Sequence, residues 1–181
     1  MNSHMSNLED IAADIRALRT GVDRARTDTA AANHHAEEII KRAMAAGFGG
    51  IAQNLSRVRD AIGEIQAGLA RADATINDVD RSVTGAPREP SPEQTITVLN
   101  PALHGVTTIR DTIAATISKI TDVQRLVASV LDGGTPGPLL ARLNDIRQTL
   151  IMVSQRCDAG KEHIGAAITQ ARQTGHAAAT H

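Results

Sequence analysis

The sequence predicts an all-α protein in which two long antiparallel helical hairpins form an up-down-up-down four-helix bundle. Apolar or small residues recur at alternating steps of three and four along four long stretches, which is the spacing of coiled-coil-like helix packing. Hydrophobic residues make up 41% of the 181 residues, yet Phe48 is the only aromatic residue. A core built from Ile, Leu, Val and Ala argues against a β-sandwich or barrel, because those folds usually draw on aromatic side chains.

The first hairpin is predicted over residues 6–83. Ser6 and Glu9 have the spacing of a capping box, in which each residue's side chain accepts a hydrogen bond from the other's backbone amide. The first helix is therefore expected to begin there, and residues 1–5 are expected to be a disordered or tag-like N-terminus. A corner at residues 47–50 joins this helix to the second one.

The first corner carries the residues that we single out as candidates for partner binding, namely Phe48, Gly49 and Gly50. Gly47 before them suits the left-handed backbone position that ends a helix. Phe48 has two interpretations: a hydrophobic plug over the end of the bundle, or an exposed anchor for a partner. The second follows from the preference for aromatic side chains at interface hot spots.

The first seam is weak between Ala25 and Ala36, where it offers only Ala and Thr. Burying Ala in place of Leu forfeits about 2 kcal/mol of hydrophobic stabilisation per position. Such a stretch either allows a very close approach of helices or marks a surface that a partner completes.

A Gly- and Pro-containing linker at residues 84–91 leads to the second hairpin, predicted over residues 92–175 with its corner at 132–138. Pro101 lies shortly after the start of the third helix, so that this helix is either kinked there or broken into two. Residues 176–181 are expected to be a frayed tail.

A capping box is also predicted at Ser91 and Gln94, with Pro92 at the first helical position. The connections are too short to run back along a helix of about 60 Å, so consecutive helices must be antiparallel. One long bundle is the simplest result. The alternative is an extended arrangement in which the hairpins stay apart and pair with another chain.

The chain offers no recognisable catalytic, cofactor or metal site. No Glu is followed by His three residues later, as a di-iron bundle would require. Cys157 lies on the apolar seam with no His nearby in sequence, which favours a buried core thiol. The Gly-rich segment at 133–137 lacks the Lys of a phosphate-binding loop. We therefore predict a protein that is not an enzyme and needs no cofactor.

Charge and hydropathy exclude further classes. The formal net charge is −1, which argues against nucleic-acid binding. The longest apolar runs, such as Leu150 to Val153, are far shorter than a membrane span of about 20 residues. The N-terminus lacks the apolar segment of a secretory signal peptide. We expect a protein made in the cytoplasm, with export by a signal-independent route left open.

The corner Phe48-Gly49-Gly50 between two antiparallel helices resembles the ESX-type helical hairpins that type VII secretion exports. The corner of that superfamily is typically Trp-x-Gly, and here Phe replaces Trp. The resemblance covers residues 6–83. It implies hairpins that pair into a four-helix bundle and act as a secretion substrate, targeting partner or chaperone-like adaptor.

The chain is also similar to actinobacterial Ala-rich helical proteins of unknown function. Its segment 126–155 resembles the helical N-terminal regions of actinobacterial polymorphic toxins. The zinc-site signature of the deaminase domains that end some of these toxins is missing. This resemblance implies a delivery or pairing part without the toxic part.

These observations predict a non-enzymatic, secretion-associated interaction module that pairs with a helical protein or toxin through a long helical face. A purely structural bundle or homo-oligomer is the alternative. A bundle that binds a metal or a small ligand is a third hypothesis.

Overall fold

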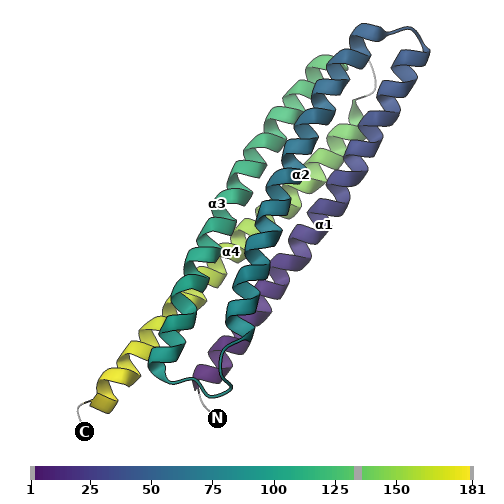
Figure 1. Ribbon diagram of the computed structural model, residues 1–181. Coiled ribbons are helices and arrows are strands. Elements are labelled where there is room, and N and C mark those ends of the chain that lie inside the picture. The colour runs from purple at the N-terminus through teal and green to yellow at the C-terminus, as the bar shows by residue number, and fades with distance from the viewer. Residues whose placement is uncertain (1–2, 133–135, 180–181) are drawn as a thin grey trace.

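The computed structural model describes residues 3–132 and 136–179, and the side chains of residues 6–132 and 136–178. The elements in chain order are α1 (Ser3–Ala45), α2 (Gly49–Thr84), α3 (Pro92–Val130) and α4 (Gly137–Ala179), shown in Figure 1. No strand occurs within the described ranges. The predicted all-α fold is confirmed.

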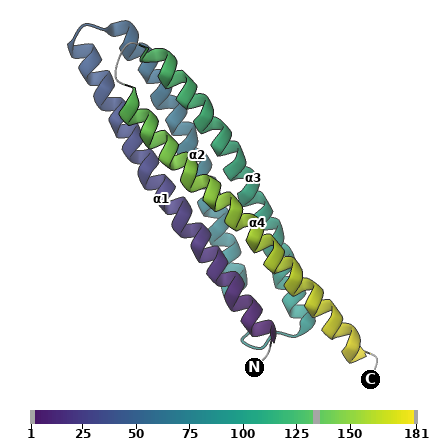
Figure 2. The same cartoon turned by 180° about the vertical axis from the view of Figure 1, so that it is seen from behind.

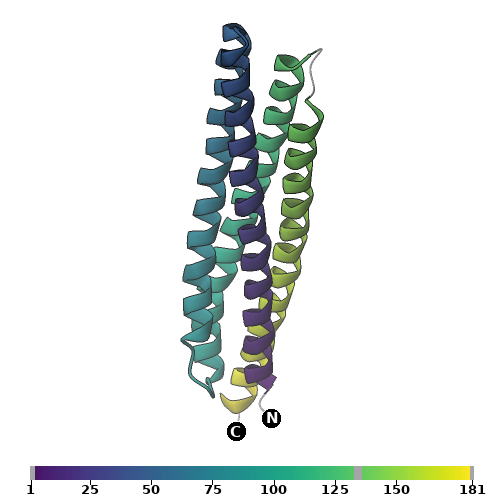
Figure 3. The ribbon, with the colours of Figure 1, turned by 90° about the vertical axis from the view of Figure 1, so that its right-hand side faces the viewer.

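The four helices form one bundle with the predicted up-down-up-down topology. Each helix runs antiparallel to the one before it (Figures 1 and 2). α1 packs against α2 and α4, and α3 packs against the same two helices. Viewed from the side in Figure 3, the two hairpins lie alongside each other. The extended alternative is therefore wrong, because each hairpin covers the apolar seams of the other.

The core is a continuous column of aliphatic side chains from all four helices. The weak stretch of the first seam lies inside this column, since Ala25, Thr29, Ala32 and Ala36 are all fully buried. The Thr29 hydroxyl donates to the carbonyl oxygen of Ala25 at 2.6 Å, so this buried polar group is satisfied within its own helix. The small side chains thus admit close neighbours, and the interpretation that a partner completes this surface is wrong.

The end of α1 follows the sequence-based prediction. Gly47 has a φ of 81°, the left-handed conformation expected of it. The amide of Phe48 donates to the carbonyl oxygen of Ala43 at 2.8 Å, and the amide of Gly47 donates to that of Met44 at 3.0 Å. This pair of bonds is a Schellman motif, which satisfies two carbonyls that a helix end leaves without donors.

The start of α1 differs from the prediction. The helix begins at Ser3, so Ser6 lies inside it and does not cap it, and residues 3–5 are helical rather than disordered. Nothing in this segment blocks helix propagation, because it contains neither Pro nor Gly. Residues 1–2 lie outside the described part of the chain.

The start of α3 carries the predicted capping box. The Ser91 hydroxyl accepts from the amide of Gln94, and the Gln94 side chain accepts from the amide of Ser91. α3 continues without interruption through Pro101, so the interpretation of two separate helices is wrong. Pro101 and Thr97, whose carbonyl loses its usual donor, are both exposed, which lets water replace the lost bond.

The remaining connections also fall near the predicted positions. α2 ends at Thr84 and α3 begins at Pro92. The second corner lies between Val130 and Gly137, and residues 133–135 of the predicted 132–138 corner lie outside the described residues. The tail is not frayed over residues 176–179, because α4 continues to Ala179 through three alanines, the strongest helix formers. Residues 180–181 are not described.

Candidate interaction site at the first helical corner

The corner between α1 and α2 is exposed and apolar. From Ala43 to Ala52 the sequence has ten consecutive residues without a polar side chain. Residues 44–51, called the tip below, are all exposed to solvent. Met44 is 65% exposed, Phe48 57% and Ile51 39%. Corners in water are normally built from polar turn residues, so this composition is unusual for its position.

The tip projects beyond the ends of α3 and α4 (Figures 1 and 3). The antiparallel register explains why. Because Asp14 on α1 lies beside His163 on α4, the start of α4 at Gly137 falls opposite the part of α1 near Ile39. The last turn of α1 therefore has no turn of α4 beside it.

The same holds for the other side of the tip. A Cβ added to Gly68 of α2 would lie 2.6 Å from the hydroxyl of Thr116 on α3, which fixes the register of these two helices. The end of α3 at Val130 then falls opposite Asn54. The first residues of α2 extend past it, so the tip is an overhang of one hairpin.

The predicted site residues Phe48, Gly49 and Gly50 all lie on this overhang. Phe48 is exposed, so the interpretation of a hydrophobic plug is wrong for the chain by itself. A Cβ at Gly49 or Gly50 would meet nothing within 4 Å, so packing does not require glycine at either position.

Met44 and Ile51 belong to the same surface and were missed by the sequence analysis. Both are large apolar residues off the buried seams, since the buried position next to Met44 is Ala43 and the one next to Ile51 is Ala52. The signal that could have found them is the run of ten residues without a polar side chain. Met152, 54% exposed on α4, is the other large exposed apolar residue among the described side chains, and it lies away from the tip.

The charges that α1 and α2 carry next to the tip are mostly basic. Between Glu38 and Asp60 the sequence contains Lys41, Arg42, Arg57 and Arg59 and no acidic residue. Lys41 pairs with Glu38 and Arg59 with Asp60. Arg42 and Arg57 are exposed, and no carboxylate of the described residues pairs with either. α1 and α2 thus give the apolar tip a mainly cationic border, and the exposed Asp132 just past the end of α3 adds one carboxylate at this end of the bundle.

The N-terminus of α2 within the tip has no side-chain cap. Phe48 occupies the N-cap position and has no side-chain acceptor. The first bond of the helix runs from the amide of Ala52 to the carbonyl oxygen of Phe48 at 3.0 Å. The amides of Gly49, Gly50 and Ile51 precede it, and the first-turn amides of a helix have no carbonyl of that helix to bind.

Outside the tip, the described residues show no cluster of side chains arranged as in a catalytic site. No group of three His, Cys, Asp or Glu side chains that could hold a metal is found among the described residues. Burial raises the pKa of the Cys157 thiol to about 12, and the neighbouring Asp158 adds to this shift. A thiol of that kind is neutral at physiological pH and therefore a poor nucleophile.

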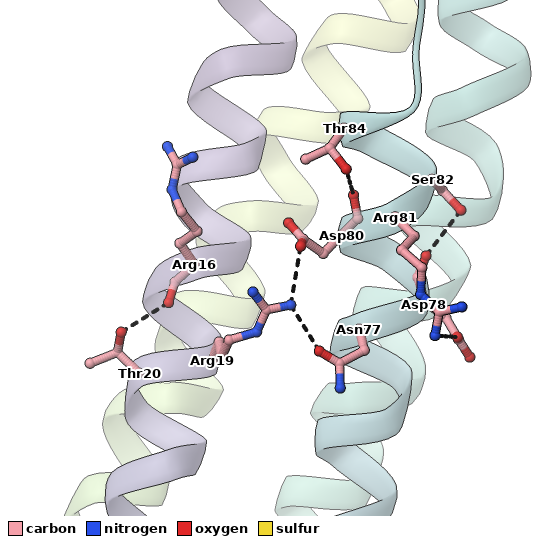
Figure 4. Close-up of polar contacts among 9 residues, drawn as sticks. All are labelled: Arg16, Arg19, Thr20, Asn77, Asp78, Asp80, Arg81, Ser82 and Thr84. Atoms are coloured by element: carbon pink, nitrogen blue, oxygen red, sulfur yellow. Dashed lines mark hydrogen bonds and ion pairs between the residues drawn. The ribbon is translucent and has the colours of Figure 1, made fainter.

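In the opposite half of the bundle, polar contacts join neighbouring helices in addition to the apolar core. Arg19 on α1 donates from Nη2 to Oδ1 of Asn77 at 2.9 Å and to Oδ2 of Asp80 at 3.1 Å (Figure 4). Nδ1 of His163 lies 2.7 Å from Oδ2 of Asp14, a hydrogen bond that raises the pKa of His163. These groups join helices to each other and form no enclosed site.

Fold and site together define a helical bundle protein with an exposed apolar tip. None of the described helices is long and apolar enough to cross a membrane. Residues 90–176 are similar to a family of unknown function (DUF6244), and this match covers α3 and nearly all of α4 but not the tip. Neither the curated proteins nor the solved structures include a significant match.

Proposed function

We propose that this chain is a non-enzymatic helical interaction module that binds a protein partner through its tip. The observation that carries the proposal is the simultaneous exposure of Met44, Phe48 and Ile51 on an overhang that no other helix covers. An exposed cluster of large apolar side chains costs solubility, and such patches on water-soluble proteins commonly mark binding surfaces. Aromatic residues are also enriched at the energetic centre of interfaces.

The partner contacts the outside of the bundle, not its seams. The apolar seams that a helical partner would otherwise use are buried between the two hairpins. This changes the expected mode of pairing: a partner that docks along a long helical face would first have to separate α1 from α4 or α2 from α3. The tip requires no such opening.

The finer form of the proposal is that the module is secretion-associated, as a substrate, an adaptor or the pairing protein of a toxin. It rests on the resemblance of the Phe48-Gly49-Gly50 corner to ESX-type hairpins. In this form the chain is made in the cytoplasm and exported without a signal peptide. A purely structural bundle or homo-oligomer is the alternative, in which the tip would contact a second copy.

The test is affinity capture from the native host with the wild-type chain, Phe48→Ser and the matched control Met152→Ser. Met152 is about as exposed as Phe48 but lies on α4 away from the tip, so its substitution removes a similar apolar surface. We expect a protein that is captured by the wild type and by Met152→Ser and lost with Phe48→Ser. Equal capture by all three chains would refute the proposal.

Light scattering of the purified chain distinguishes the interaction module from the homo-oligomer. A monomer is expected for an interaction module whose partner is absent. A stable dimer or tetramer that Phe48→Ser converts into a monomer would instead support self-association through the tip.

A further inference from the structure

The shape of the tip restricts how a partner can hold it. A standard protein interface takes roughly 20–30 residues from each side, whereas the tip offers eight residues on a narrow overhang. A flat partner surface would touch only part of them. A concave partner surface would enclose Met44, Phe48 and Ile51 from several directions and remove more of their apolar area from water.

The charges around the tip restrict the chemistry of the partner's rim. Arg42, in the last turn of α1, and Arg57, about two turns into α2, are exposed and lack carboxylate partners within the described chain. Lys41 adds a third positive charge, only partly balanced by Glu38 at 3.4 Å. Complementary charges steer association and exclude wrong partners. A partner rim with carboxylates would match these cations.

The uncapped first turn of α2 agrees with the same chemistry. Phe48 supplies no acceptor for the amides of Gly49, Gly50 and Ile51, and negative charge is favoured at a helix N-terminus. A hydrocarbon phase would leave these donors without acceptors at a substantial cost. A protein rim that carries carboxylates or carbonyls does not have this cost, which favours a protein over the interior of a bilayer.

We infer that the partner of this chain is a protein with an apolar socket bordered by acidic side chains, into which the tip inserts with Phe48 at its centre. This inference rests on the proposed function and specifies its partner. A second copy of this chain does not fit the description, because two tips brought together would place Lys41, Arg42 and Arg57 of one copy near those of the other. Like charges in that arrangement repel.

The experiment uses the protein captured by the wild-type chain in the host, purified and titrated against variants of the full chain. The variants are Arg42→Glu, Arg57→Glu, the double variant and Arg172→Glu. Arg172 is an exposed arginine about two turns before the end of α4, at the end of the bundle opposite the tip, so its reversal changes the net charge as much as either single reversal without changing the border of the tip. Circular dichroism confirms that each variant is folded.

We expect the double variant to weaken binding about tenfold or more, mainly by slowing association, while Arg172→Glu stays near the wild type. The wild-type affinity should fall as salt is raised. If capture depends on Phe48 but the affinity is unchanged by charge reversal and by salt, the acidic socket is wrong and the proposed function stands.

Binding to vesicles tests whether the tip recognises a lipid membrane instead of a protein. The wild-type chain and Phe48→Ser are sedimented with vesicles of phosphatidylcholine alone and of phosphatidylcholine with phosphatidylglycerol. No Phe48-dependent sedimentation is expected. Phe48-dependent binding to the anionic vesicles, without Phe48-dependent capture of any protein, would overturn both the inference and the proposed function.

Discussion

The half of the bundle near the chain ends is joined by polar contacts between helices, whereas in the half near the tip the described side chains make only apolar contacts between helices. In the first half every pair of adjacent helices shares at least one such contact. The contacts are Asn7–Gln170, Asp14–His163, Arg19–Asn77, Arg19–Asp80, Arg26–Asp73, Glu64–Lys119 and Arg110–Asp158.

In the tip half the polar contacts stay within single helices. Over residues 27–60, 120–132 and 136–156, ion pairs join only neighbours along one chain segment, such as Glu38 with Lys41 and Asp122 with Arg125. Side-chain hydrogen bonds there also return to the same helix, as for Thr29 and Ser56. Among the side chains that the structure describes here, shape and hydrophobic burial fix the helices against one another.

The contacts of the two halves contribute differently to stability and to the register between helices. Exposed ion pairs contribute about 0–1 kcal/mol each, so the polar half gains specificity of helix register more than stability. Aliphatic burial contributes far more per residue but distinguishes one register from another less sharply. The tip therefore belongs to the half of the bundle in which small shifts of one helix against another break the fewest specific contacts.

The largest expected effect concerns the opening of the polar half. Cys157 is fully buried there, and burial raises its pKa to about 12. At about pH 8 its reaction with a disulfide reagent should be at least roughly a thousandfold slower in the native protein than in urea, because reaction requires unfolding. Stopped-flow absorbance measures both rates. Rapid labelling of the native protein would show that the polar half opens locally. The polar half would then not be the more firmly held of the two.

The second prediction concerns the apolar half. Ile146 is fully buried, so Ile146→Ala should lower the free energy of unfolding by about 2–5 kcal/mol. Ile51→Ala is the matched control on the partly exposed tip and should cost well under half as much. Urea denaturation followed by circular dichroism gives both values. Similar costs at the two positions would mean that packing does not dominate this half.

The third prediction sharpens the role of close packing between α2 and α3. A Cβ at Gly105 would overlap Cγ2 of Val79, whose branched side chain has little freedom in a helix, so Gly105→Ala should destabilise by about 1–2 kcal/mol. A Cβ at Gly63 would meet nothing within 4 Å. Gly63→Ala should therefore stabilise by about 0.5–1 kcal/mol through helix propensity. Thermal or urea unfolding measures the stability of both variants. A change of the same sign in both would contradict the difference in packing between the two positions.

The smallest expected effect is the pH dependence of the contact between Asp14 and His163. The hydrogen bond and the charge of Asp14 raise the folded-state pKa of His163 above its ordinary value. The added stability is thus fully present below the unfolded pKa of about 6.5 and is lost as the pH rises through the folded pKa.

His163→Gln should therefore destabilise slightly near pH 5.5 and have no effect near pH 9, with a difference below about 1 kcal/mol because the His163 side chain is 59% exposed. Urea midpoints of both chains at the two pH values measure it. An equal difference in stability between the two chains at both pH values would mean that something other than the charge of His163 causes it.

Most of the fold could be predicted because helical periodicity reports burial directly. Seam residues such as Ile62, Leu143 and Ile146 are fully buried as the spacing requires. The errors lie at helix ends. Ser6 has the right chemistry for a cap, but helix propagation continued past it to Ser3. A local cap pattern does not decide where a helix begins when the preceding residues can also be helical.

The candidate site was only partly predictable. Phe48 could be found because it is the single aromatic residue, and Gly47 because its position requires a left-handed conformation. The exposure of Phe48 could not be derived from the sequence. It depends on how far α1 and α2 extend past α3 and α4, which is set by the register between the hairpins. Met44 and Ile51 were missed for the same reason.

The N- and C-terminal ends of the described chain lie at the same end of the bundle, opposite the tip (Figures 1 and 2). Since α1 is 43 residues long, about 60 Å of rigid rod separates them from the tip. A label fused at either end would therefore be held at a distance of this order from the tip.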